Sequence, residues 1–180
     1  NRAMEILTMD FLDTLKDSQK TKNKIRAGIE IFNASGSMGM IGGQAADMMG
    51  QGKNNDPDFL EYIHLKKTTA MIVASVRAGA ILGNATAPQL NDFTKIASHI
   101  GFAFQIADDL LDICGDEALL GKPIKSDGKS HKLTYPSIHG MEASYEKIKS
   151  LHHDAYALLS KYKDMNFLND LLKSLENRKF

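Results

Sequence analysis

The sequence predicts an all-α protein. Most apolar residues recur at spacings of three and four, which is the period of a helix with one buried face. The alternation of apolar and polar residues that marks a strand is hard to find, and only 4 prolines interrupt the 180 residues. No internal repeat or low-complexity linker is visible, and the length suits one domain. We therefore expect residues 1–180 to form a single all-α domain.

Six helices are predicted, and each has its own supporting pattern. In the first, Ile6, Met9 and Leu12 share one face. In the third, Asp56 is typical of an N-cap and Pro57 of the first helical position. A break in this third helix near residues 66–69 is one alternative. The predicted spans are 3–16, 21–49, 57–82, 89–113, 135–161 and 167–177.

Composition and charge exclude several classes of protein. Acidic and basic residues balance at 22 each, whereas a general nucleic-acid binder carries a basic excess. The single cysteine, Cys114, cannot form an intrachain disulfide, which fits the reducing cytosol. The longest apolar run, from Ala70 to Val76, is far shorter than the ~20 residues of a membrane span. We expect a cytoplasmic protein without nucleic-acid or membrane partners.

The helix predicted near residues 100–114 carries a narrow acidic strip. Apolar side chains cover most of its circumference when it is projected at about 100° per residue. An ordinary surface helix has a broader polar face. This helix is therefore predicted to be largely enclosed, with acidic side chains on its only polar strip. The strip contains Gln105, Asp108, Asp109 and Asp112.

The aspartates of this strip need compensation, because neighbouring carboxylates repel one another and burial disfavours their charged forms. Asp108 and Asp112 lie one turn apart and can point toward the same spot. Oxygen ligands of this kind suit Mg²⁺, which often bridges one or two carboxylates to substrate phosphates. The alternative is a solvated acidic face or a set of structural salt bridges.

Two lysine-bearing segments could supply the compensating charge. The first, residues 115–134, exceeds the ~12–15 residues beyond which irregular loops are often functional. The second is HLKKTT, residues 64–69, where hydroxyl groups stand beside the lysines. Lysine acts as a mobile point charge toward phosphate, so a polyphosphate could lie between these lysines and the metal. The alternative is that both segments are simply solvated. The lysines of the first segment are Lys122, Lys125, Lys129 and Lys132.

Two glycine-containing segments do not match nucleotide-binding motifs. GDEALLGK has five residues between its glycines, whereas a phosphate-binding loop requires four. Gly36, Gly39 and Gly43 lack the spacing of a dinucleotide fingerprint, and no strand precedes them. Small residues on one helical face instead allow a neighbouring helix to approach closely, which is the interpretation we favour.

In their order along the chain, the motifs resemble those of trans-isoprenyl diphosphate synthases, the polyprenyl synthetase family. FQIADDLLDICGD, followed by LGK and SDGKSHKLTYP, resembles the second aspartate-rich region of that family. GMIGGQAADM and EYIHLKKTTAMI are similar to its preceding segments, and ENRKF is similar to its C-terminal tails. The likeness spans nearly the whole chain and is greatest to the bacterial farnesyl diphosphate synthases.

The resemblance implies a fold and a reaction. The fold is the isoprenoid synthase type I helical bundle, usually a homodimer around a deep cavity, here without its N-terminal helices. The reaction uses Mg²⁺ and condenses isopentenyl diphosphate with an allylic diphosphate, dimethylallyl or geranyl diphosphate. The implied product is short, with farnesyl diphosphate as the first choice.

The resemblance also implies roles for individual residues. Asp108 is expected to bind the metal, with Asp109 and Asp112 acting directly or through water. Lys67, Thr68 and Gln105 are the expected catalytic residues and would hold the allylic diphosphate. The other implied residues are Lys122 and Lys132 on the diphosphate, Phe104 facing the second substrate, and Gln44 and Asp47 in supporting positions.

The chain departs from the family pattern in one large respect. It has a single Asp-Asp pair, at 108–109, whereas the family has a further aspartate-rich motif in its front half. The chain also opens with Asn1 inside a helical pattern. We therefore interpret it as the back part of a longer enzyme, inactive on its own. The alternatives are a non-catalytic partner subunit of a prenyl synthase, a geranylgeranyl diphosphate synthase, and a terpene cyclase on the same fold.

Overall fold

The computed structural model describes residues 2–13, 18–50, 56–114 and 133–176. Every regular element in these ranges is a helix, which confirms the all-α prediction. The elements are α1 (Arg2–Asp13), α2 (Ser18–Ser35), α3 (Met40–Gly50), α4 (Pro57–His64), η1 (Leu65–Thr69), α5 (Ala70–Leu82), α6 (Ala87–Cys114), α9 (Tyr135–His139), α10 (Met141–Leu159) and α11 (Asn166–Glu176).

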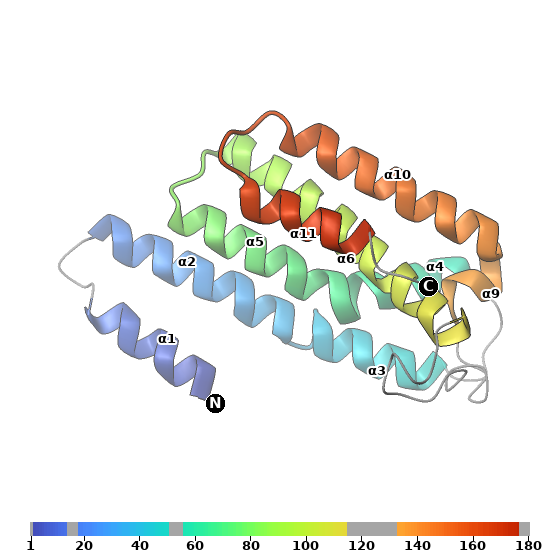
Figure 1. Ribbon diagram of the computed structural model, residues 1–180. Coiled ribbons are helices and arrows are strands. Elements are labelled where there is room, and N and C mark those ends of the chain that lie inside the picture. The colour runs from blue at the N-terminus through green and yellow to red at the C-terminus, as the bar shows by residue number, and fades with distance from the viewer. Residues whose placement is uncertain (1, 14–17, 51–55, 115–132, 177–180) are drawn as a thin grey trace.

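The long helices lie side by side in the order α2, α5, α6 and α10, since each contacts the next (Figure 1). α1 lies along α2 at one edge, and α11 contacts α10. α3, α4, α9 and the C-terminal end of α6 gather at one end of the molecule (Figure 1). Segments distant in sequence therefore meet where α6 carries its aspartates.

Two apolar clusters hold α6 in place. Leu110, in its C-terminal half, is fully buried and packs with Ile148 of α10. Ile96, in its N-terminal half, packs with Leu159 and Leu172. Full burial of one such side chain contributes about 1.5–3 kcal/mol. These contacts fix the rotation of α6 and so determine where its polar strip points.

A polar tie joins α2, α5 and α6. Arg77 donates to the two carboxylate oxygens of Glu30 at 2.8 and 2.6 Å, and to the Thr94 hydroxyl at 2.7 Å. The hydrogen bonds from Arg77 lower the pKa of the Glu30 carboxyl below its usual value of 4.5. The side chains of Arg77 and Glu30 are 25% and 27% exposed, so the pair that links the three helices is partly shielded from solvent.

Two of the predicted helices are divided in the structure. The predicted helix 21–49 ends at Ser35 and resumes at Met40 after a bend that contains Gly36 and Gly39. The predicted helix 135–161 is divided at Gly140, whose φ of 85° is a conformation that favours glycine. In both places the glycines interrupt a continuous helical period, so the prediction of single helices was wrong.

The predicted helix 57–82 is confirmed, with a local widening in place of a break. The Asp56 side chain caps its start by accepting hydrogen bonds from the N–H groups of Asp58 and Phe59 at 3.0 and 3.2 Å. Pro57 follows at the first helical position. α4, the π-helical turn η1 and α5 then follow one another directly to Leu82.

Two further expectations concern the membrane and the lysine segment 115–134. None of the described helices is both long enough and apolar enough to cross a membrane. Of the lysine segment, only Leu133 and Thr134 are among the described residues. The single domain over residues 1–180 stays a prediction.

Candidate active site

The candidate site lies at the end of the bundle where α3, η1, α6 and the start of α9 meet (Figure 1). Contacts of η1 with both α3 and α6 bring these elements together. The side chains predicted from the sequence come from three of them: Gln44 and Asp47 from α3, Lys67 and Thr68 from η1, and Phe104, Gln105, Asp108, Asp109 and Asp112 from α6.

Two glycines allow η1 to lie directly against its neighbours. A Cβ added at Gly43 of α3 would overlap the backbone of Lys67. A Cβ added at Gly101 of α6 would lie 2.9 Å from the Cα of Thr69. The close helix approach predicted for the glycine rhythm is therefore present at Gly43. π-helical turns are frequent at functional sites, and here the turn is held on both sides.

Lys67 is oriented by a carboxylate from α3. Its Nζ lies 2.7 Å from Oδ2 of Asp47, whose side chain is 9% exposed, while the lysine side chain is 28% exposed. An ammonium group has three donors, and the ion pair with Asp47 uses one of them. The remaining donors make Lys67 suitable for binding an anion.

A chain of hydrogen bonds connects η1 to the acidic helix. The Thr68 hydroxyl donates to Oε1 of Gln105 at 2.6 Å, and Nε2 of Gln105 donates to Oδ1 of Asp109 at 3.2 Å. The amide of Gln105 is thus fixed at both ends. Three of the residues predicted to share the site are joined in one network.

Asp109 points into the protein. Its residue is 3% exposed, and its Oδ2 accepts a hydrogen bond from the N–H of Tyr135 at 2.8 Å. Nε2 of His64 lies 3.2 Å from the same oxygen. With Gln105 on the other oxygen, both oxygens of this carboxylate have protein donors.

Asp108 and Asp112 form the remaining part of the acidic strip. Asp108 is half-buried and Asp112 is buried at 6% exposure, one turn further along α6. Among the described residues, no three histidine, cysteine or acidic side chains are grouped closely enough to hold a metal ion. Mg²⁺ is usually held by only one or two carboxylates together with waters and substrate phosphates. The all-oxygen donor pair fits that requirement.

Four other residues were predicted to belong to the site. Gln44 is exposed on α3, and Phe104 is half-buried on α6. Lys122 and Lys132 lie outside the described residues. The metal-binding and diphosphate-binding roles predicted for these residues and for the aspartates stay predictions.

His64 was not singled out by the sequence analysis, although it begins the segment HLKKTT. It is 2% exposed, and its ring lies 5.7 Å from the ring of Phe102 in an edge-on arrangement and 6.4 Å from that of Tyr135 in a stacked one. Burial raises the pKa of the Tyr135 phenol, so this neighbouring ring stays uncharged. The sequence signal for His64 is its position one turn before Thr68 on the same helical segment.

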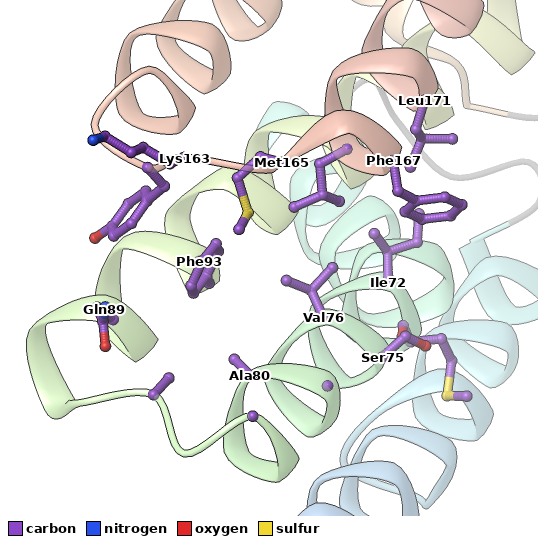
Figure 2. Close-up of a pocket in the computed structure, with 16 residues that line it drawn as sticks. Ile72, Ser75, Val76, Ala80, Gln89, Phe93, Lys163, Met165, Phe167 and Leu171 are labelled. Carbon is purple, nitrogen blue, oxygen red and sulfur yellow. The ribbon is translucent and has the colours of Figure 1, made fainter.

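An apolar cavity of about 830 Å³ lies away from this network, between α5, α6 and the chain around α11. Figure 2 shows Ile72 and Val76 of α5 facing Phe93 of α6 and Met165 across it. Its lining includes none of the residues that make the polar network described above. We locate the candidate site by its hydrogen bonds and charges rather than by this cavity.

Comparison with known proteins finds relatives along nearly the whole chain. The family model for polyprenyl synthetase matches residues 2–173. The farnesyl diphosphate synthase of Geobacillus stearothermophilus is 42% identical over 81% of this chain and 52% of its own length. That of Escherichia coli is 38% identical over 96% of this chain and 61% of its own length. The chain thus spans about half to three-fifths of these curated relatives.

Solved structures agree on the fold. An FPP/GFPP synthase of Zymomonas mobilis superposes with a TM-score of 0.73 at 27% identity, over 86% of this chain and 51% of that one. A geranyltransferase of Helicobacter pylori, solved with magnesium and isoprenyl diphosphate, superposes with a TM-score of 0.74 at 24% identity, over 93% of this chain and 54% of that one. Because one family model covers nearly every residue and relatives with more than 30% identity agree with it, this chain belongs to the polyprenyl synthetase family.

Proposed function

We propose that these residues form the diphosphate-binding part of a prenyltransferase that condenses isopentenyl diphosphate with an allylic diphosphate. The observation that carries the proposal is the hydrogen-bond chain from Thr68 through Gln105 to Asp109, which sets a lysine and a hydroxyl beside an acidic helix. A diphosphate requires cationic and hydroxyl donors, and its counter-ion requires carboxylates. Membership of the polyprenyl synthetase family supports the same reaction class.

Lys67 would bind the allylic diphosphate through the donors that Asp47 does not use. Departure of pyrophosphate places growing negative charge on its oxygens, and an ammonium group already oriented there lowers the barrier. The Thr68 hydroxyl has one proton, so donating it to a phosphate oxygen requires that it release Oε1 of Gln105. Gln105 would then remain held through Asp109.

Mg²⁺ held by Asp108 and Asp112 would neutralise charge on the leaving pyrophosphate. The apolar neighbours of these aspartates on α6 are packed, with Ile106, Leu110 and Leu111 all at 2% exposure or less. Such surroundings exclude water, which would otherwise quench a carbocation.

Substitution of Asp108 tests the proposal. In the complete enzyme, Asp108→Ala should reduce Mg²⁺-dependent condensation by more than the ~10–100-fold typical of residues that only support a metal ligand. Far-ultraviolet circular dichroism should show unchanged helicity, because Asp108 is half-buried and outside the apolar clusters. Asp170→Ala is the matched control, since Asp170 is an exposed carboxylate on α11. Full turnover by the Asp108 variant would refute the role of the acidic strip.

The proposed product is farnesyl diphosphate, because relatives named for that product are up to 42% identical to the chain. Geranylgeranyl diphosphate is the alternative, since the synthase of that name from Cyanophora paradoxa is 34% identical over 85% of the chain. Chromatography of the dephosphorylated products of the complete enzyme would distinguish farnesol from geranylgeraniol.

A further inference from the structure

We infer that His64 is a positioning residue that holds the Asp109 carboxylate inward, so that Asp109 aligns the site and only Asp108 and Asp112 face the metal. The inference rests on the proposed function and deepens it. The sequence left open whether Asp109 binds the metal directly or through water. The inference gives Asp109 no direct contact with the metal.

The first support is that protein donors occupy both oxygens of the Asp109 carboxylate. The side chains of His64 and Asp109 are 2% and 4% exposed, and Nε2 lies 3.2 Å from Oδ2. The same oxygen accepts the Tyr135 N–H at 2.8 Å, and Oδ1 accepts from Gln105 at 3.2 Å. Turning Asp109 toward a metal would leave the buried His64 and the half-buried amides of Gln105 and Tyr135 without this acceptor, which is costly.

The second support is the way in which the imidazole is held. Its ring packs against Phe102 and Tyr135, and Nδ1 has no hydrogen-bond partner within the described part of the chain. The contact with Asp109 is therefore the only polar contact recorded for this ring among those residues.

The third support is that two links join α6 to the continuous helical segment formed by α4 and η1. His64 reaches Asp109, and Thr68, four residues later, reaches Gln105, four residues before Asp109. Residues four apart lie on one face of a helical segment. The two links therefore fix both the distance and the rotation of η1 against α6, and with them the place of Lys67 relative to Asp108.

The division of roles can be tested with the 180-residue chain and inorganic pyrophosphate. Isothermal titration calorimetry at fixed pyrophosphate would give the half-saturating Mg²⁺ concentration. Asp108→Asn should raise it by about tenfold or more, as expected for loss of about 1.4 kcal/mol or more of binding free energy. Asp109→Asn, which keeps the shape and one carbonyl acceptor, should raise it by less than about threefold. Equal shifts for the two variants would overturn the inference.

Two substitutions test His64 itself. His64→Leu should weaken magnesium pyrophosphate binding by ~10-fold, the lower end of the effect of residues that orient ligands. His64→Gln carries an N–H donor near the position of Nε2 and should restore most of the affinity. His152→Leu is the matched control, because His152 is a histidine of 3% exposure on α10, outside the network. An equal loss in His64→Gln and His64→Leu, or in His152→Leu, would overturn the inference.

A ligand-free measurement separates this inference from the proposed function. The Tyr135 amide proton should exchange slowly with solvent in the wild-type chain and about tenfold faster in His64→Leu, because loss of His64 loosens its acceptor. A rapidly exchanging Tyr135 amide in the wild type would overturn the positioning role of His64 and leave the proposed function unaffected. A wild-type chain that binds no magnesium pyrophosphate, with a protected Tyr135 amide, would overturn the proposed function and the metal roles of the aspartates.

Discussion

Two adjacent lysines of η1 have different surroundings. Lys67 forms an ion pair with the buried Asp47 at 2.7 Å. Lys66 instead lies with its Nζ 6.0 Å from the centre of the Tyr62 ring, where a cation–π contact is weak. The helical turn thus directs one ammonium group toward the candidate site and the other toward an aromatic ring.

This contrast predicts unequal effects of the same substitution. Lys67→Gln in the complete enzyme should lower kcat/KM by roughly 10²–10³-fold, the usual effect of removing one preorganised donor from developing negative charge. Lys66→Gln should change kcat/KM by less than about threefold. Steady-state kinetics with varied allylic diphosphate would measure both. Similar losses in the two variants would show that positive charge near the site matters, but that the orientation of Lys67 by Asp47 does not.

Glycine contacts determine how η1 fits between its neighbouring helices. Gly43 leaves no room for a Cβ beside the backbone of Lys67, whereas a Cβ at Gly79 of α5 would meet nothing within 4 Å. The two positions therefore provide the same substitution in opposite surroundings.

Alanine at these two glycines should change stability in opposite directions. Gly43→Ala should lower the free energy of unfolding by about 1–3 kcal/mol, since a close-packed backbone must shift. Gly79→Ala should raise it by about 0.5–1 kcal/mol, because alanine loses less conformational entropy in a helix. Urea unfolding followed by circular dichroism would measure both. A Gly43→Ala variant as stable as Gly79→Ala would contradict the close contact between α3 and η1.

The tie between Arg77 and Glu30 makes a pH-dependent contribution to stability. The pKa of Glu30 is lowered in the folded protein, chiefly by hydrogen bonds from Arg77. A lowered carboxyl pKa stabilises the fold above the unfolded value of 4.5, and the contribution is lost as pH falls through the folded value. Glu30→Gln should therefore cost about 1 kcal/mol near neutral pH, within the range for partly exposed pairs.

The same cost should shrink as pH falls below 4.5, where the unfolded carboxyl begins to bind a proton. It should approach zero once pH lies below the lowered folded value, where the native carboxyl is protonated as well. Urea unfolding of the wild type and Glu30→Gln at several pH values would follow the difference. If the difference in unfolding free energy stayed constant down to the lowest pH at which both proteins fold, the charge on Glu30 would contribute nothing to this tie.

At the scale of the whole molecule, the chain covers only part of the length of its relatives, 52% for the Geobacillus enzyme and 61% for the Escherichia coli enzyme. It contains one Asp-Asp pair, at 108–109. We therefore expect this chain to show magnesium pyrophosphate binding without turnover. The homodimer implied by the family resemblance stays a prediction.

The 180-residue chain alone should bind magnesium pyrophosphate without condensing isopentenyl and allylic diphosphates. The physical reason is that one acidic strip can bind the diphosphate of one substrate. Condensation also requires the second substrate to be bound and oriented. Incorporation of labelled isopentenyl diphosphate would measure turnover, with the complete Geobacillus enzyme as the positive control. Measurable condensation by the chain alone would contradict the prediction.

Much of the fold and the composition of the site could be predicted without coordinates. Helical hydrogen bonds and the faces of a helix involve residues three and four apart, so local periodicity placed most of the helices and the acidic strip of α6. The glycines at 36, 39 and 140 were the exceptions, because backbone conformation there prevailed over apolar spacing. The resemblance of ordered motifs indicated the family in the same way, from short local patterns.

The direction of each side chain could not be predicted in this way. Thr68 and Gln105 are 37 residues apart, and Asp109 and Tyr135 are 26 apart. Helical periodicity places Asp108, Asp109 and Asp112 on one strip, but it does not say which of them meets His64. That choice follows from the rotation of α6 against η1 and α10, which long-range packing sets and local spacing does not contain.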